Sequence, residues 1–126
     1  MHLSHHNDLV LNDRIVYDDE AHGPVFDNSE GDRIAHALGN RSIAFLANHG
    51  VVVVGQSVAE TFDDLYYLER ACKVQVLARS IGTIRKVDPQ VVEKTAQQIA
   101  GEKAQCYRHF DALKRILDRE EPDYRN

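Results

Sequence analysis

Residues 43–54, IAFLANHGVVVV, decide the fold class of this chain. Two apolar runs, 43–47 and 51–54, are separated by Asn48-His49-Gly50, a sequence that favours a turn. The consecutive valines are stiff at χ1 and favour a strand. Because the hydrophobicity of both runs is continuous rather than alternating, the pattern predicts two buried strands, joined by a tight connection and covered by helices on both faces.

The segment before these strands predicts two shorter strands and one helix. Residues 8–11 and 14–17 have the composition of short strands on either side of a turn. Ser29 occupies the position of a helix N-cap and Gly39 that of a C-cap glycine, which together predict a helix over residues 30–38.

The segment after the valines predicts a longer helix. Ser57 and Glu60 fit the capping-box pattern, in which a serine and a later glutamate each bond the other's backbone, and they predict a helix from about 58 to 80. Apolar side chains recur there at helical spacing and predict its buried stripe: Val58, Phe62, Leu65, Cys72 and Val76. Glu69 falls on the same stripe.

The C-terminal region predicts a last helix over residues 89–118, with Asp88 as its N-cap and Pro89 as its first residue. Only Lys103 is polar in its apolar row. A continuous helix of this length would extend roughly 45 Å, longer than a compact domain of this size allows. We therefore expect either a break at Gly101 or packing of the helix end on a neighbouring subunit.

Composition bounds the class of protein. The 126 residues are 43% hydrophobic, with 15 basic and 20 acidic side chains and a net charge of −5. The length predicts one domain over 1–126, with a leader at 1–28, a core at 29–82 and a helical region at 88–119. The longest apolar run, 51–54, is too short for a membrane span, and scattered acidic charge disfavours nucleic acid. We expect a cytoplasmic protein with neither nucleic-acid nor membrane partners.

His49 is the residue that most directly suggests chemistry. It lies between the two predicted strands, where a side chain can line a cleft, and Gly50 beside it allows a close backbone approach. A neutral imidazole there could bind a divalent metal or transfer a proton. The alternative is a histidine that only forms a hydrogen bond within its loop, and the local sequence alone favours that alternative.

Several motifs, in order along the chain, resemble the class II aldolase/adducin family. They are Asn48-His49-Gly50, Gly55, residues 57–60 (SVAE), residues 65–71 (LYYLERA) and Gln75. Residues 37–77 are similar to the C-terminal core of that family almost throughout, and residues 17–20 and 29–33 resemble the segment that leads into it. The resemblance therefore rests on ordered motifs rather than on one short pattern.

The resemblance implies a fold and a chemistry. The family fold is a three-layer α/β/α domain with a largely antiparallel central sheet, here truncated and followed by C-terminal helices. Its enzymes use zinc or another divalent metal to cleave hydroxy-carbonyl or sugar-phosphate substrates through an enediolate, between the subunits of homo-oligomers. His49 matches one of the three zinc-ligand histidines, and Asn48, Gly50 and Glu69 are expected to support its loop. We expect a small-molecule carbonyl substrate and a dimer or tetramer.

The sequence departs from the family pattern before His49. The family takes its other two ligands from an upstream His-x-His motif and its catalytic glutamate from further upstream, and residues 1–48 contain no His-x-His. One histidine is not a zinc site, because a catalytic zinc takes about three protein ligands. His2, His5 and His6 are a weak substitute, since adjacent residues on a strand point to opposite faces.

Two further features have structural explanations. A carboxylate on an apolar stripe is costly unless it is paired, so we expect Glu69 to bond the sheet or to pair with Lys73, one turn on. Support of the metal loop is the less favoured role for Glu69. Cys72 and Cys106 are expected to be buried free thiols rather than a disulfide.

Three functions are compatible with these residues. The first is a zinc-dependent class II aldolase-like lyase, whose missing ligands come from another chain or from the N-terminal histidines. The second is a non-catalytic, oligomerising adducin-like module, and the third is a truncated, inactive relative of an aldolase. The missing ligands and glutamate favour the second and third. Because missing strands leave a sheet edge and apolar faces uncovered, we also expect self-association.

Overall fold

The structure is a computed structural model that describes residues 11, 13–20, 28–100 and 103–125. The predicted strand at 8–11 lies outside this part of the chain, except for Leu11, which is buried. In chain order the elements are β1 (Ile15–Asp18), α2 (Ser29–Leu38), β2 (Ile43–Leu46), β3 (Gly50–Val53), α3 (Val58–Ser80), α4 (Pro89–Ala100), α5 (Lys103–Glu120) and the 3-10 helix η1 (Pro122–Arg125).

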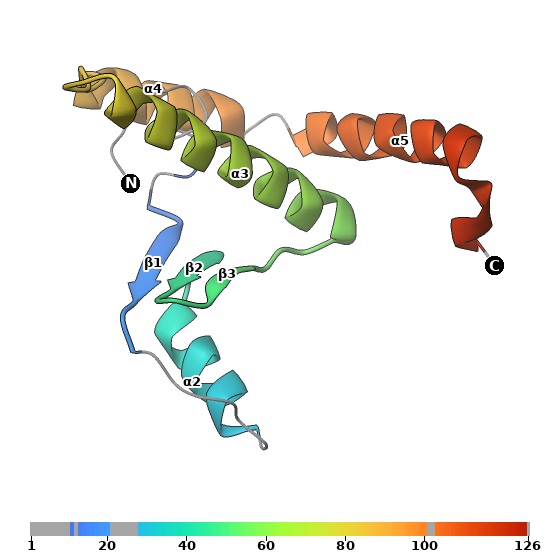
Figure 1. Cartoon of the computed structure of the whole chain (residues 1–126), viewed down its shortest axis with the longest axis horizontal. Coiled ribbons are helices and arrows are strands. Elements are labelled where there is room, and N and C mark those ends of the chain that lie inside the picture. The colour runs from blue at the N-terminus through green and yellow to red at the C-terminus, as the bar shows by residue number, and fades with distance from the viewer. Residues whose placement is uncertain (1–10, 12, 21–27, 101–102, 126) are drawn as a thin grey trace.

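The three described strands form one sheet in the order β1-β2-β3. β1 runs parallel to β2, and β2 runs antiparallel to β3. The sheet lies between α2 and α3, while α5 and η1 extend to one side, past the N-terminal end of α3 (Figure 1). The α/β class is therefore confirmed, and so are the two strands predicted around Asn48-His49-Gly50.

The apolar core lies between β2 and α3. Its fully buried members are Leu11, Ile43, Leu68 and Ala71. The pleat of β2 directs Ala44, which is also fully buried, to the opposite face, where α2 packs. An aliphatic contact surface of this kind stabilises a domain through burial rather than through charge.

The edge strand β3 departs from the prediction that both strands are covered on both faces. Val51 is 37% exposed and Val54, just beyond the strand, is 41% exposed. The prediction is wrong here because β3 is the last strand of the described sheet, and its only described strand partner is β2. Continuous hydrophobicity therefore does not show by itself that a strand is central.

The first turn of α3 is capped as predicted. Ser57 is its N-cap, and the Ser57 Oγ accepts a hydrogen bond from the backbone N–H of Glu60 at 3.2 Å. In α2 the prediction needs correction, because Asn28 is the N-cap and Ser29 is the first helical residue. Gly39 does end α2, with a φ of 53° that glycine adopts without strain.

The buried face of α3 differs from the predicted one. Ala59, Leu68, Ala71 and Gln75 are its buried residues. Of the predicted stripe, Cys72 packs against the core, but Val58, Leu65 and Val76 are 74%, 43% and 68% exposed. Residues 68, 71 and 75 also recur at helical spacing, and the small side chain of Ala71 lets α3 approach the sheet closely, so this second face packs on the core.

The C-terminal region forms two helices, α4 and α5, rather than one helix over 89–118. They lie on either side of residues 101–102, where the sequence suggested a break. α5 packs on α3 and on η1. No helix in the described ranges has the length and apolarity needed to cross a membrane.

Candidate functional site

His49 lies on the turn between β2 and β3. The strand pairing closes with Leu46 opposite Gly50, and the backbone N–H of His49 donates to the carbonyl oxygen of Leu46 at 3.2 Å. Asn48 has a φ of 56°, in the left-handed region that asparagine tolerates, and Gly50 has a φ of 157°. The path of the turn therefore depends on the two residues that flank His49.

The imidazole of His49 is exposed to solvent. Among the contacts that the structure defines, none is a hydrogen bond or ion pair from this ring, so the loop hydrogen bond considered as its alternative role is not seen. The ring is held by the backbone of the turn rather than by its own contacts. Both of its nitrogens are available to a ligand that approaches from outside.

A metal at His49 would need further ligands. Within the described ranges, no group of three histidine, cysteine, aspartate or glutamate side chains could hold a metal ion. His2, His5 and His6 lie outside these ranges. Since a catalytic zinc takes about three protein ligands, the described residues do not by themselves fit a zinc site.

Glu69 lies on the exposed side of α3. The predicted hydrogen bond from a buried Glu69 to the sheet is wrong, because α3 turns a different face to the sheet. The structure defines no ion pair between Glu69 and Lys73 and no contact between Glu69 and His49, over the residues that it describes. The structure therefore does not bring these two candidate site residues together.

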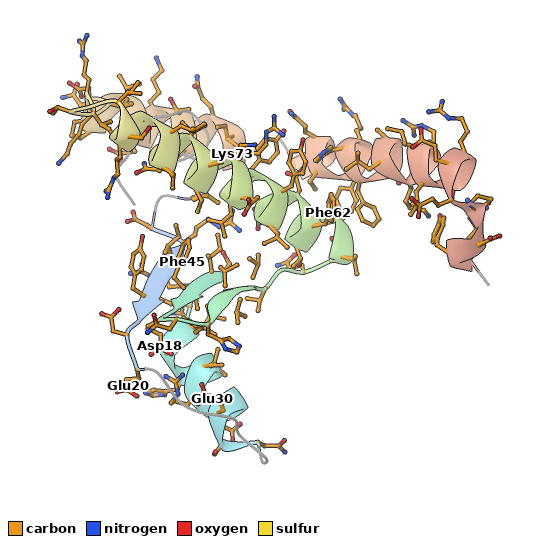
Figure 2. The ribbon with its side chains drawn as sticks, in the orientation of Figure 1. Asp18, Glu20, Glu30, Phe45, Phe62 and Lys73 are labelled. Atoms are coloured by element: carbon orange, nitrogen blue, oxygen red, sulfur yellow. The ribbon has the colours of Figure 1, made fainter. Side chains whose placement is uncertain are left out.

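A charged cluster at the end of β1 was missed by the sequence reasoning. Arg33 on α2 donates from Nη1 to Oδ2 of Asp18 at 2.5 Å and from Nε to Oε2 of Glu30 at 2.8 Å, and Glu20 is 3.8 Å away (Figure 2). The hydrogen bonds to Glu30 and then to Asp18 raise the pKa of the Arg33 guanidinium. The cluster ties α2 to β1.

An acidic run such as residues 18–20 favours a solvated loop, but Asp18 at its start is only 7% exposed. The i,i+3 spacing of Glu30 and Arg33 was a visible signal of a pair, but the approach of β1 to α2 was not. Because Asp18 and Glu30 are bonded to Arg33, they act as structural anchors here.

The contact between α3 and α5 is polar and aromatic. His109 Nδ1 lies 2.5 Å from Oδ1 of Asp63, and the Tyr107 hydroxyl donates to Oε1 of Glu60 at 3.0 Å. The His109 ring packs edge-on against Tyr66, with 4.6 Å between ring centroids. Asp63 and His109 are far apart in sequence, so no local spacing predicted this pair.

Neither Cys72 nor Cys106 forms a disulfide, as predicted, but Cys72 is only half-buried. Cys106 is buried at the α3–α5 contact, and burial raises the pKa of its thiol, with further contributions from the carboxylates of Asp63 and Glu60. A thiol with a raised pKa stays protonated at neutral pH. Cys106 is therefore neither an activated nucleophile nor a thiolate metal ligand in this environment.

An open groove lies at the N-terminal end of α3. Its volume is about 520 Å³, and its lining runs from Gly55 through Leu65 and includes Thr61 and Phe62. A Cβ atom added at Gly55 would lie 2.6 Å from the Thr61 hydroxyl, so a larger residue here would force Thr61 or the connection to shift. Residues 48–50 do not line the groove, which separates it from the His49 turn.

Comparison with known proteins identifies the family of this chain. The sequence profile of the Class II Aldolase and Adducin N-terminal domain matches residues 2–76. A Pseudomonas aeruginosa protein named as an aldolase class 2 protein is 33% identical over 109 residues, which cover 82% of this chain and 42% of that protein. Human beta-adducin is 30% identical over 128 residues, which cover 90% of this chain and 17% of that protein.

A solved structure shares both the fold and the sequence signal. The crystal structure of an aldolase II superfamily protein from Pseudomonas syringae superposes with a TM-score of 0.85 and 32% identity, over 98% of this chain and 51% of that chain. This chain thus spans less than half the length of the two curated relatives and about half of the solved one. The chain belongs to the class II aldolase and adducin family.

Proposed function

We propose that this chain is a class II aldolase-type module that contributes His49 as one ligand to a divalent metal, zinc in the first place. The other ligands come from outside the described residues, in a site that is complete only in an assembly. The observation that carries the proposal is the exposed imidazole of His49 on a turn whose backbone is set by Asn48 and Gly50. Family membership supports it.

The reaction class that we propose for the completed site is aldol cleavage of a hydroxy-carbonyl compound or sugar phosphate. A divalent metal supplies Lewis-acid stabilisation of the enediolate in this chemistry. The part that falls to this chain is to hold one imidazole at a fixed position on a packed hairpin. We assign no acid or base from the described residues, because none of their contacts brings a second titratable group to His49.

A second candidate function is a non-catalytic, oligomerising module of the adducin type. It is favoured by the single candidate ligand among the described residues, by the match to human beta-adducin over 90% of this chain and by the exposed apolar residues of α3. In both cases we propose a homo-oligomer, a dimer or a tetramer, in the cytoplasm. The two functions differ in whether His49 binds metal.

The deciding experiment is elemental analysis of tag-free, dialysed protein beside a His49→Ala variant. We expect zinc near one per chain in the wild type and its loss in the variant. His36→Ala, which removes an exposed histidine from α2, is the matched control and is expected to keep the metal. If neither the wild type nor the His49→Ala variant contains metal, the non-catalytic module is the function that remains. If the variant keeps the metal, other side chains hold it.

Metal-loaded protein should then be assayed for cleavage of a panel of phosphorylated and unphosphorylated hydroxy-carbonyl compounds. We expect activity that is lost on chelation and restored by zinc. Bound zinc without any cleavage would contradict the lyase proposal while leaving His49 as a ligand.

A further inference from the structure

The end of β1 lies beside the turn that carries His49. The parallel pairing of β1 with β2 ends with Asp18 opposite Leu46, and the backbone N–H of Ala47 donates to the carbonyl oxygen of Asp18 at 2.9 Å. The backbone N–H of His49 donates in turn to the carbonyl oxygen of Leu46 at 3.2 Å. The backbone of Asp18 therefore holds the chain where the turn begins, just before the candidate metal ligand.

The side chain of Asp18 depends on Arg33. It is only 5% exposed, and its Oδ2 accepts from Nη1 of Arg33 at 2.5 Å, while its Oδ1 accepts from the backbone N–H of Glu20 at 3.2 Å. Arg33 is itself fixed on α2 by Glu30, which accepts from its Nε at 2.8 Å and from its Nη2 at 2.6 Å. Figure 2 shows Asp18 at the end of β1 and Glu30 on α2 close by.

We propose that Arg33 is a positioning residue for His49. A buried carboxylate is costly without a cation, so loss of the guanidinium drives Asp18 and the end of β1 towards water. The Asp18 carbonyl then no longer holds the N–H of Ala47, and the turn loses its fixed path on that side. The consequence for metal binding rests on the proposed function of His49, whereas the effect on the turn does not.

The opposite end of the hairpin provides an internal reference. There the backbone N–H of Val54 donates to the carbonyl oxygen of Ser42 at 2.9 Å. A second arginine also holds β1, because Nη1 of Arg41 donates to the carbonyl oxygen of Ile15, the first residue of the strand, at 2.9 Å. A general loss of stability would affect both ends of the hairpin, whereas the positioning role predicts a change at the turn alone.

Hydrogen exchange of the metal-free full chain, followed by NMR for each amide, measures the hold on the turn. In Arg33→Met we expect the Ala47 amide to exchange about tenfold faster or more, because hydrogen bonds to charged groups are worth such a factor. The Val54 amide should keep its wild-type rate. Arg41→Met is the matched control and should leave the rate of Ala47 unchanged. Equal acceleration at Ala47 and Val54, or none at Ala47, would overturn the proposal.

A second substitution tests the cause. Adding Asp18→Asn to Arg33→Met removes the buried charge, so we expect the exchange of Ala47 to slow towards its wild-type rate. Adding Asp19→Asn, at the exposed neighbouring position, should leave it fast. Exchange that stays equally fast with Asp18→Asn would overturn the proposal. Circular dichroism checks folding, and Arg33→Lys, which keeps the charge but not the bidentate fork, replaces Arg33→Met if that variant does not fold; it should accelerate Ala47 by a smaller factor.

Zinc titration of the same variants measures the consequence for His49. We expect a dissociation constant about tenfold higher in Arg33→Met than in the wild type, and an unchanged one in Arg41→Met. Unchanged zinc affinity in Arg33→Met would overturn the positioning role at the metal. If the wild type binds no zinc, the proposed function of His49 fails, and the exchange of Ala47 still decides whether Arg33 positions the turn.

Discussion

The sheet and the C-terminal helix α5 are anchored by different forces. In the sheet, Ile43 and Ala44 are completely buried among apolar neighbours. In α5 the buried side chain among those described is Cys106, and the helix is otherwise held to α3 by polar and aromatic contacts such as His109 with Asp63. The hairpin that carries His49 thus belongs to the part stabilised by apolar burial.

The largest expected effect tests the apolar anchor. Leu68 is 1% exposed at the centre of the core between α3 and β2. Leu68→Ala should lower the free energy of unfolding by about 2–5 kcal/mol, because it removes buried methyl groups and leaves a cavity. Ile81→Ala, at a position that is 89% exposed, should change it by less than about 0.5 kcal/mol. Urea denaturation at low protein concentration measures both, and equal losses would contradict the assigned core.

The next largest effect is expected in the connection between β3 and α3. In Gly55→Ala the new Cβ would meet the Thr61 hydroxyl at 2.6 Å, so the connection must shift. We expect a loss of about 1–3 kcal/mol in urea denaturation. Gly31→Ala is the matched control, because a Cβ there meets nothing within 4 Å on helix α2, and it should leave stability unchanged or raise it by up to about 1 kcal/mol. A neutral Gly55→Ala would show that this packing is not tight.

A change at the α3–α5 contact should affect one region only. Asp63→Asn weakens the charge-assisted contact with His109 and is expected to cost about 1–2 kcal/mol. Hydrogen exchange should become faster in α5 and stay unchanged in β2 and β3, since their anchoring is apolar. Asp111→Asn, an exposed acid on α5, is the control. Faster exchange in the whole molecule would contradict the separation of the two regions.

The contact between α5 and η1 should depend on pH. Hydrogen bonds, first from Tyr124 and then from Arg125, lower the pKa of Asp118 below its ordinary 3.8. A lowered folded-state pKa means that this stabilisation is fully present above pH 3.8 and is lost as the pH falls through the lowered value. In Tyr124→Phe the pKa of Asp118, followed by carboxyl NMR, should rise towards 3.8. An unchanged pKa would exclude Tyr124 as its main cause.

The smallest effect on stability is expected at His49. Its ring is exposed and makes no contact that the structure defines within its described residues, so His49→Ala should change the free energy of unfolding by less than about 0.5 kcal/mol. Thermal and urea denaturation of metal-free protein measure this. A loss of several kcal/mol would instead identify His49 as a packed structural residue.

Local signals in the sequence were enough to predict the secondary-structure elements around His49. The valines of β3, the Ser57 cap and Gly39 each act on the backbone within a few residues. Their effect on secondary structure can therefore be predicted from the adjacent sequence. The buried face of α3 was not readable in this way. Two sets of apolar residues recur there at helical spacing, and only the approach of the sheet decides between the set with Leu68 and the set with Leu65.

The same distinction between local and long-range contacts applies to the candidate site. The turn at Asn48-His49-Gly50 was predictable because its backbone depends on two adjacent residues. The contacts of Arg33 with Asp18 and of His109 with Asp63 join separate elements. The spacing of these residues in the sequence does not predict them. The partner ligands that we propose for His49 would also come from elsewhere in the chain or assembly, so local spacing could not predict them either.

The most direct test of the central claim is a zinc titration of the protein, followed by NMR signals of its seven histidine imidazoles. Metal binding by His49 predicts that its ring signals shift and saturate at one zinc per chain, and that His49→Ala abolishes stoichiometric binding. Shifts confined to His2, His5 and His6, with the His49 signals unmoved at saturation, would contradict the claim and leave a non-catalytic module.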